Sequence, residues 1–319
     1  MKKLAHTPYD GSATPFTIGL KPFDMANWIE IDGDLEAYLA EKDRLFLTAP
    51  DRVFMARPDT VEAQREVLDD LVRHLPERFP GTYGLAEDRM AIGEEGRSVP
   101  LAADDPAPLK TASLLVQDDL VLMRKCDDGW RLVAASLCFP SSWSLAEKFD
   151  RPMQVIHATV PDFGPGTRTA GMITRIFDKL RVELPVERLN WSLQENAALY
   201  HPRSKKERDE GREVDGGFLA GMSPDRIHLR VERQTLRKMP RSGDILFTIR
   251  IFLDPISVLV SHPAGPELAC RLLGQLAALD AEQLAYKGLA VGRERLTAYL
   301  RQVADSAPVA LDGQSRQRV

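Results

Sequence analysis

The most constraining feature of this chain is a pair of long strand-like segments separated by a tight turn. In residues 226–238 apolar side chains alternate with polar ones: Ile227, Leu229 and Val231 alternate with His228, Arg230 and Glu232. A period of two is typical of a strand whose two faces meet different surroundings. A second apolar segment spans residues 244–253, and the Pro-Arg-Ser-Gly sequence at 240–243 has the composition of a turn. The pair therefore predicts a long antiparallel hairpin.

A second hairpin is predicted near the middle of the chain. Residues 120–123 and 130–135 are apolar, and they flank Asp127-Asp128-Gly129, whose composition suits a turn with positive φ. Residues 188–194 are a further strand candidate. Between and around the strands, amphipathic patterns and capping signals predict helices at 34–42, 60–77, 144–149, 167–180, 266–286 and 292–304.

The order of these elements predicts the fold class. Hairpin-linked strands, with helices before, between and after them, indicate an α+β fold with an antiparallel sheet rather than alternating βαβ units. Residues 80–108 are rich in Gly, Pro and acidic residues and predict a long irregular connection. Asp59 and Glu62 form a capping-box pattern at the start of the second helix. Without an internal repeat or a linker, one domain is expected over residues 1–304, followed by a disordered tail at 305–319.

Composition excludes several classes of protein. A net charge of −5 leaves no basic excess for binding nucleic acid. The most apolar run, residues 245–260, is interrupted by Arg250, Asp254 and Pro255, so no membrane span is expected. The N-terminal lysines precede no apolar stretch, which argues against a signal peptide. Three widely separated cysteines fit a reducing compartment, so a cytoplasmic protein is expected.

The sequence has none of the common nucleotide, nucleophile or metal motifs. No G-x-G-x-x-G follows a strand, and there is no Walker-A loop, H-E-x-x-H or G-x-S-x-G. The absence of C-x-x-C and C-x-x-C-H excludes four-cysteine iron–sulfur ligation and covalent c-type haem. If the protein performs redox chemistry, its electrons therefore come from another protein.

His157 has the most apolar neighbours among the six histidines. It lies in the segment Gln-Val-Ile-His-Ala-Thr-Val, which is bounded by prolines. Periodicity alone favours a buried histidine that hydrogen-bonds to a backbone carbonyl. The alternative is a metal or haem ligand, which requires a neutral imidazole in an apolar wall with its second nitrogen hydrogen-bonded.

Arg233 lies on the apolar face of the predicted strand 226–238. An unpaired guanidinium on such a face is costly, so an anionic partner is expected. A haem propionate or a protein carboxylate would each satisfy Arg233, and the residues alone favour neither. Arg250 lies opposite the apolar face of its strand and is a weaker candidate for the same role.

Four segments carry a more specific signal, and the last of them continues into residues 240–243 and 247–250. They are residues 118–123, 154–161, 188–192 and 229–236. Together they resemble the haem-dependent oxidative N-demethylase alpha-subunit family, in order and over almost the whole chain, from Pro15 to Ala304. The resemblance implies a PAS-like antiparallel sheet with added N- and C-terminal helices that enclose a haem pocket.

The resemblance also implies roles for particular residues. His157, in an Ile-His-x-x-Val-Pro element, would be the proximal ligand of a haem b. The family pattern has proline in place of Thr159 and glycine in place of Asp162, which leaves the shape of this loop open. The candidates for binding the remainder of the cofactor are Arg233, Gln234 and Arg250.

The implied activity is the O2-dependent oxidative N-demethylation of a small secondary amine such as dimethylamine. Oxidation of an N-methyl group opposite His157 would give a carbinolamine, which collapses to formaldehyde and the demethylated amine. Electrons would come from NADPH through a partner subunit that carries FMN and an iron–sulfur cluster, and a folate-binding partner would capture formaldehyde.

The remaining predictions concern the substrate pocket and the alternative functions of the protein. An aromatic wall with a nearby acceptor suits a cationic amine, and the pocket candidates are Asn190, Trp191 and Glu195. A PAS-like haem or gas sensor without turnover is the alternative function. A scaffold that has lost haem is a third.

Overall fold

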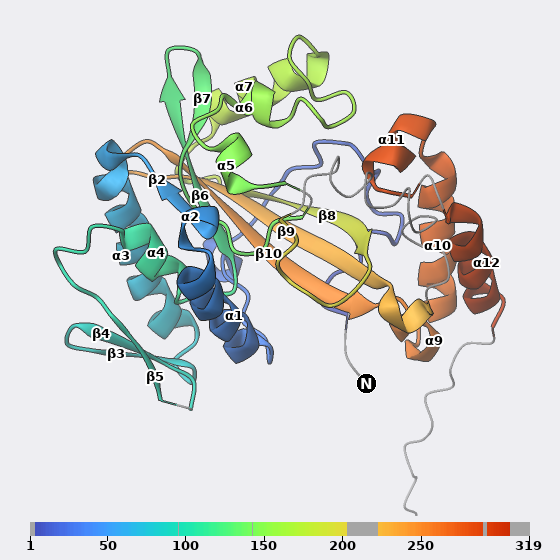
Figure 1. Ribbon diagram of the computed structural model, residues 1–319, viewed down its shortest axis with the longest axis horizontal. Coiled ribbons are helices and arrows are strands. Elements are labelled where there is room, and N and C mark those ends of the chain that lie inside the picture. Colours follow the sequence, from blue (N-terminus) through green and yellow to red (C-terminus); the bar gives the residue numbers. More distant parts are fainter. Residues whose placement is uncertain (1–3, 95, 142, 203–222, 290–291, 307–319) are drawn as a thin grey trace, which may run out of the picture.

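The computed structural model describes residues 4–94, 96–141, 143–202, 223–289 and 292–306. Its centre is a seven-stranded antiparallel sheet with the strand order β1-β8-β9-β10-β6-β7-β2 (Figure 1). The strands are β1 (Lys21–Pro22), β2 (Phe54–Ala56), β6 (Asp119–Cys126), β7 (Gly129–Ser136), β8 (Val186–Gln194), β9 (His228–Lys238) and β10 (Ile245–Pro255). The predicted α+β class is confirmed.

The two predicted hairpins form the middle of this sheet. β9 and β10 pair along their whole lengths, from Ile245 opposite Lys238 to Pro255 opposite His228. β6 and β7 turn at Gly129, whose φ of 117° costs glycine little because it has no Cβ. The third predicted strand is β8, which pairs with β9. Residues far apart in sequence are thereby brought onto one surface.

A second, three-stranded sheet lies where the sequence predicts irregular chain. Its strands are β3 (Tyr83–Ala86), β4 (Arg89–Ile92) and β5 (Arg97–Pro100). The prediction for residues 80–108 is therefore wrong in this part. Strands of four residues carry too few alternations to be recognised, and this sheet is held by packing of Met90, Ile92 and Val99 into a core shared with α3.

The helices gather in three groups. They are α1 (Leu35–Thr48), α2 (Pro50–Val53), α3 (Val61–Arg78), α4 (Pro108–Ser113), α5 (Leu145–Lys148), α6 (Met153–Ile156), α7 (Arg168–Lys179), α9 (Val258–Ser261), α10 (Gly265–Ala278), α11 (Ala281–Tyr286) and α12 (Arg293–Ala304). In Figure 1, α1–α4 lie with the small sheet at one end of the large sheet, α9–α12 lie at the other end, and α5–α7 lie above it.

Two predictions about helix ends are wrong. The helix predicted at 266–286 is two helices, because Asp280 forms a capping box with Gln283 and starts α11. The capping box predicted from Asp59 does not form, since Thr60 takes the N-cap position and the Asp59 carboxylate pairs with Arg57 and Arg124 instead. The predicted tail lies, from residue 307 onward, outside the described residues.

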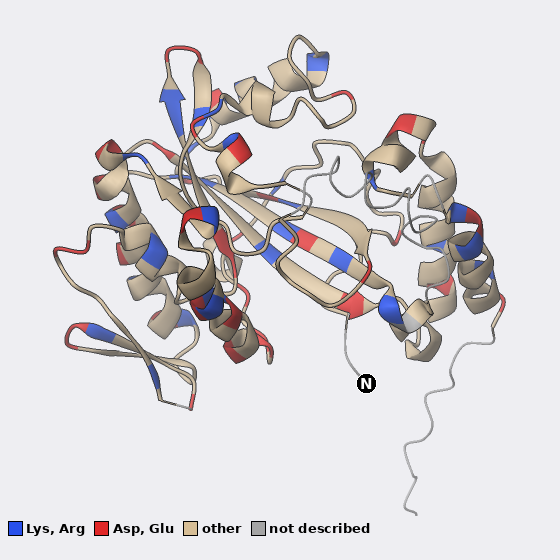
Figure 2. Ribbon diagram, in the orientation of Figure 1, with Lys and Arg blue, Asp and Glu red and all other residues tan. Residues whose placement is uncertain are grey.

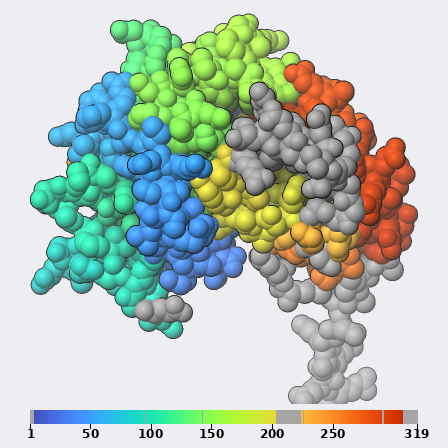
Figure 3. Space-filling model, viewed as in Figure 1, coloured from blue at the N-terminus to red at the C-terminus, as the bar shows by residue number. Residues whose placement is uncertain are grey.

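The two faces of the large sheet pack against different helices. Leu229 and Val231 of β9 share a hydrophobic cluster with α10 and α12, whereas Leu236 shares another with α5–α7. Side chains of a strand alternate between faces, so the even-numbered positions of β9 lie on the α5–α7 face and the odd-numbered ones on the other face. On that other face Leu229 and Val231 meet the C-terminal helices, whereas Arg237 pairs with Asp70 on α3 at 3.1 Å. Figure 3 shows the segment containing α5–α7, in green, between the blue N-terminal helices and the red C-terminal ones.

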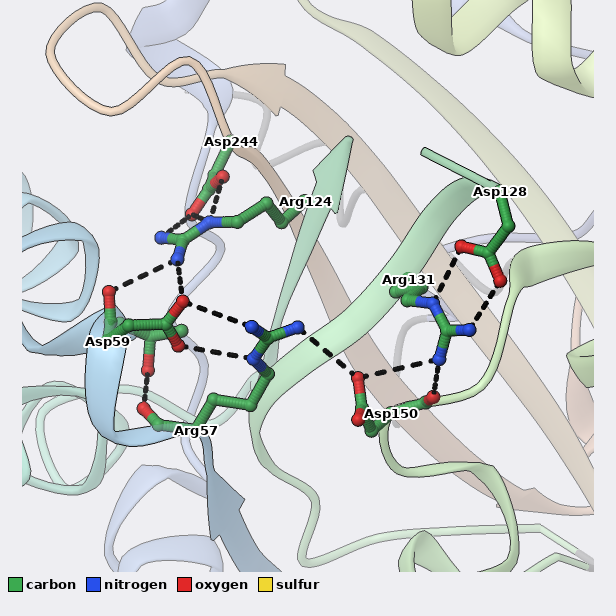
Figure 4. Close-up of polar contacts among 8 residues, drawn as sticks. Arg57, Asp59, Arg124, Asp128, Arg131, Asp150 and Asp244 are labelled. Carbon is green, nitrogen blue, oxygen red and sulfur yellow. Dashed lines mark hydrogen bonds and ion pairs between the residues drawn. The ribbon is translucent and has the colours of Figure 1, made fainter. Parts of the chain in front are cut away.

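An ion-pair network fixes the chain just before α6 (Figure 4). Arg131 on β7 pairs with Asp128 and with Asp150, and Arg57 links Asp150 to Asp59. The N–H of Asp150 also donates to the carbonyl of Leu132 at 2.8 Å. These contacts hold Asp150 at φ 54°, a backbone conformation that is costly for a residue with a Cβ. α6 therefore starts from a point anchored on β7.

Candidate functional site

A cavity of about 310 Å³ lies between helices α5–α7 and the face of the large sheet that carries the even-numbered residues of β9. Its size falls in the range of small-molecule sites, about 300–1,000 Å³. Most of its walls are apolar, with the aromatic side chains of Phe139, Trp143, Phe163, Phe177 and Phe247 among them. The polar groups that line it include Lys148, His157, Arg188, Asn190, Ser192, Glu232, Gln234 and Lys287.

Strand register places the polar groups of the sheet side by side. Asn190 lies opposite Glu232, and Arg188 lies opposite Gln234. On the other edge of β9, Gln234 lies opposite Ile249. Within this row the Gln234 amide donates to the Glu232 carboxylate at 2.9 Å. The floor of the cavity is therefore a polar stripe inside an apolar enclosure.

His157 is the residue that ends α6, and it lines the cavity from the helical side. The pKa of His157 is lowered to about 4, mainly by burial and also by nearby Lys148 and Arg188, while hydrogen bonding to the backbone of Met153 acts the other way. Among the described residues, no side chain hydrogen-bonds to the ring. The imidazole is therefore neutral at pH 7, as a metal-ligating histidine must be.

The cavity carries more positive than negative groups. Burial lowers the pKa values of Lys148 and Lys287 to about 8, and it also lowers the pKa of Arg188. Glu232 is the carboxylate that lines the cavity, and the buried Arg230 already donates to it at 3.1 Å. The Nε of Arg188 is buried and finds no hydrogen-bond partner in the part of the chain that the structure describes. Figure 2 shows bands of both charges, blue and red, within the central strands.

The sequence matches the family model described as haem-dependent oxidative N-demethylase, alpha subunit-like, over residues 19–297. The chain belongs to this family. The match contains His157 and every strand that borders the cavity. The description of the N-demethylase family points to an oxidoreductase that depends on haem and works with other subunits.

The family's haem dependence agrees with the ligands available in the described residues. Nowhere among them do three His, Cys, Asp or Glu side chains gather as they would around a bare metal ion. A haem iron needs only one or two ligands from the protein, and a single histidine is sufficient. No helix in the described ranges is long and apolar enough to cross a membrane.

The loop after His157 explains one departure from the N-demethylase pattern. Asp162 has φ 64°, in the left-handed region that glycine adopts at least cost. A glycine in the family pattern would satisfy this backbone, and aspartate is among the residues that tolerate it. The loop can therefore hold aspartate at this position. Nothing in the structure explains Thr159, whose side chain is exposed.

The cavity brings together four of the seven predicted site residues: His157, Asn190, Trp191 and Gln234. Trp191 also donates from Nε1 to Gln275 on α10 at 2.7 Å, so its polar atom is already used on the other side of the sheet. Glu195 follows the end of β8, is exposed and does not line the cavity.

Arg233 and Arg250 lie away from the cavity, on the opposite face of the sheet. Arg233 is 2% exposed, and its guanidinium contacts Glu187 at 2.7 Å and Glu30 at 3.1 Å. Arg250 pairs with Asp32 at 2.6 Å. The partner expected for Arg233 is therefore a protein carboxylate, and the expectation that these two arginines hold the cofactor is corrected by their position.

Replacing Arg233 with methionine should destabilise the fold without weakening cofactor binding. The change leaves the Glu187 and Glu30 carboxylates without their buried partner, which we expect to lower the free energy of unfolding by about 3 kcal/mol. Urea unfolding measures this loss. Haem affinity of the folded variant should equal that of wild type, and a fall in affinity with unchanged stability would contradict this placement.

The depressed pKa of His157 makes the stability of the cofactor-free protein depend on pH. The pKa is 6.5 for an ordinary histidine and about 4 in the fold, so between these values the unfolded chain binds more protons. The free energy of unfolding should therefore fall as pH is lowered from about 6.5 to about 4. Urea unfolding of wild type and of His157→Asn across this range isolates the effect, because the variant should lack this component.

The sequence interpretation missed the four charged residues that line the cavity: Lys148, Arg188, Glu232 and Lys287. Polar residues that alternate along a strand ordinarily indicate a solvent-facing surface. No local signal shows that α5–α7 cover this surface. Glu232 had a signal in the sequence, because it lies within segment 229–236, one of the segments that resemble the family.

Proposed function

We propose that this chain is the haem-carrying catalytic subunit of an oxidative N-demethylase that acts on a small methylated amine such as dimethylamine. The observation that carries the proposal is His157, a neutral imidazole in the wall of an apolar cavity, in a member of this family. On this proposal the antiparallel sheet and its helical cover correspond to the PAS-like haem fold of the family.

The cavity fits haem by the chemistry of its residues. His157 would supply the axial nitrogen, and the backbone hydrogen bonding at Met153 sets the orientation of its ring. The aromatic and aliphatic walls suit a flat apolar macrocycle. The buried, unpartnered Nε of Arg188 is suited to a carboxylate. When bound, the haem b would supply the redox centre for activating O2.

The overall reaction balances with an external donor. One atom of O2 goes to the N-methyl carbon and the other leaves as water, which consumes two electrons and two protons. The carbon–nitrogen bond of the resulting carbinolamine then breaks to release formaldehyde and the demethylated amine. The electrons would come from NADPH through a partner with FMN and an iron–sulfur cluster, and a folate-binding partner would remove formaldehyde.

The polar floor of the cavity offers a place for the amine. A secondary ammonium is attracted to a carboxylate and to an aromatic face. Glu232 supplies the carboxylate that the sequence interpretation assigned to Glu195, and Asn190 lies directly opposite it across β8 and β9. The apolar walls would exclude bulk water from the N-methyl group.

The proposal is tested by spectroscopy and product analysis on one preparation. The protein is purified from haem-supplied cells and its Soret band is titrated with dimethylamine. Formaldehyde is then measured in the presence of O2, NADPH and a ferredoxin–ferredoxin reductase pair as electron source. A Soret shift with amine-dependent formaldehyde is expected. Binding of carbon monoxide or nitric oxide with no response to amines would instead identify a sensor, and the lack of any Soret band would identify a scaffold.

A further inference from the structure

Three cations line the cavity, and among its described lining residues Glu232 is the one carboxylate. Lys148 on α5, Arg188 on β8 and Lys287 after α11 reach it from three separate elements. The Glu232 carboxylate already accepts from Arg230 and from Gln234. The excess positive charge is therefore a property of the site and belongs to no single element.

Each cation is held by contacts that do not neutralise it. Lys287 Nζ donates to the Trp191 carbonyl at 2.6 Å, and Lys148 Nζ lies 4.3 Å from the centre of the Trp143 ring. Arg188 has the least support, because its buried Nε has no hydrogen-bond partner among the described residues. Burial lowers the pKa of all three groups, and the Glu232 carboxylate that they share offsets this only in part. A bound anion would relieve this cost.

We infer that Arg188, assisted by Lys148 and Lys287, binds the two propionate carboxylates of haem. The inference rests on the proposed function. The chemical match is specific, because haem presents two carboxylates at one edge and otherwise an apolar surface. Arg188 offers the planar guanidinium that pairs best with a carboxylate, and the two lysines offer point charges for the other oxygens. Arg233, by contrast, is already satisfied by Glu187 and Glu30.

The position of Arg188 relative to His157 supports the assignment. Arg188 lines the same cavity as His157 from β8, and Lys148 lines it from α5. Lys287 lines it from the end of α11. A ligand that binds His157 in this cavity can therefore be met by all three cations.

The test compares haem with its dimethyl ester, which keeps the macrocycle and removes both negative charges. Cofactor-free wild type and Arg188→Met are titrated with each ligand, and binding is followed by the Soret band and by quenching of tryptophan fluorescence. A charge-assisted hydrogen bond contributes about 1.5–3 kcal/mol, so haem binding to the variant should weaken about 10- to 100-fold. Binding of the ester should change by no more than about twofold.

Matched variants separate charge from folding. Arg175→Met removes an exposed arginine on α7 that does not line the cavity, and it should bind both ligands like wild type. Lys148→Met serves as the second cavity variant if Arg188→Met fails to fold, and it should also lose haem affinity selectively. Equal weakening of both ligands, or of neither, would overturn the inference. Failure of wild type to bind either ligand would overturn the proposed function itself.

Discussion

Substituting alanine for His157 is expected to remove the axial ligand and at least about 100-fold of haem affinity. Loss of a group that only orients a ligand costs about 10- to 100-fold, so loss of the ligand itself should cost no less. The measurement is a haem titration with the Soret band as readout. Imidazole added to the variant should restore the spectrum, because it fills the space left by the side chain and supplies the same nitrogen.

The control for this experiment is another histidine. His228 begins β9, is half-buried, hydrogen-bonds to the backbone carbonyl of Arg226 and does not line the cavity. His228→Ala should bind haem like wild type. If His157→Ala keeps an unchanged Soret spectrum, another residue is the ligand and the site assigned here is wrong.

The second large effect is expected at Gly265, the first residue of α10. A Cβ at this position would lie 1.8 Å from the carbonyl oxygen of Leu259 in α9, and no L-residue tolerates such a contact. Since the obstacle is backbone, it cannot move aside as a side chain would. Gly265→Ala should therefore lower the free energy of unfolding by about 3 kcal/mol, measured by urea unfolding.

A second glycine of α10, Gly274, should respond to the same substitution with a gain in stability. Gly274 lies within α10, is exposed and has no atom within 4 Å of the place its Cβ would occupy. Gly274→Ala should stabilise the protein by about 0.5–1 kcal/mol, because alanine loses less conformational entropy in a helix. Equal destabilisation by both substitutions would show that helix α10, and not its contact with α9, is the sensitive element.

The sequence predicted the central sheet because its strands are long enough to show their period. β9 and β10 each have 11 residues, and their alternation survives in the structure. The strands of the small sheet have four residues each, and their burial depends on packing against other elements, α3 among them. A local pattern of four residues carries no such information.

The candidate site was predicted in part, and the reason lies in the same alternation. Arg233 was correctly expected to need an anion, but its partners Glu30 and Glu187 are distant in sequence, so the pattern did not identify them. Adjacent residues of a strand face opposite ways. Arg233 and Gln234 therefore point to opposite faces of β9, and the structure places only Gln234 in the cavity.

β9 therefore has two faces with different roles, one in the stability of the fold and the other in the cavity. Its odd positions hold the C-terminal helices and the buried ion pairs in place, while its even positions set the chemistry of the cavity. On the proposed function, exchange of Gln234 would change the polar floor of the cavity without removing a partner from a buried ion pair. Exchange of Glu232 would also leave the buried Arg230 without its carboxylate, so this position is tied to the stability of the fold.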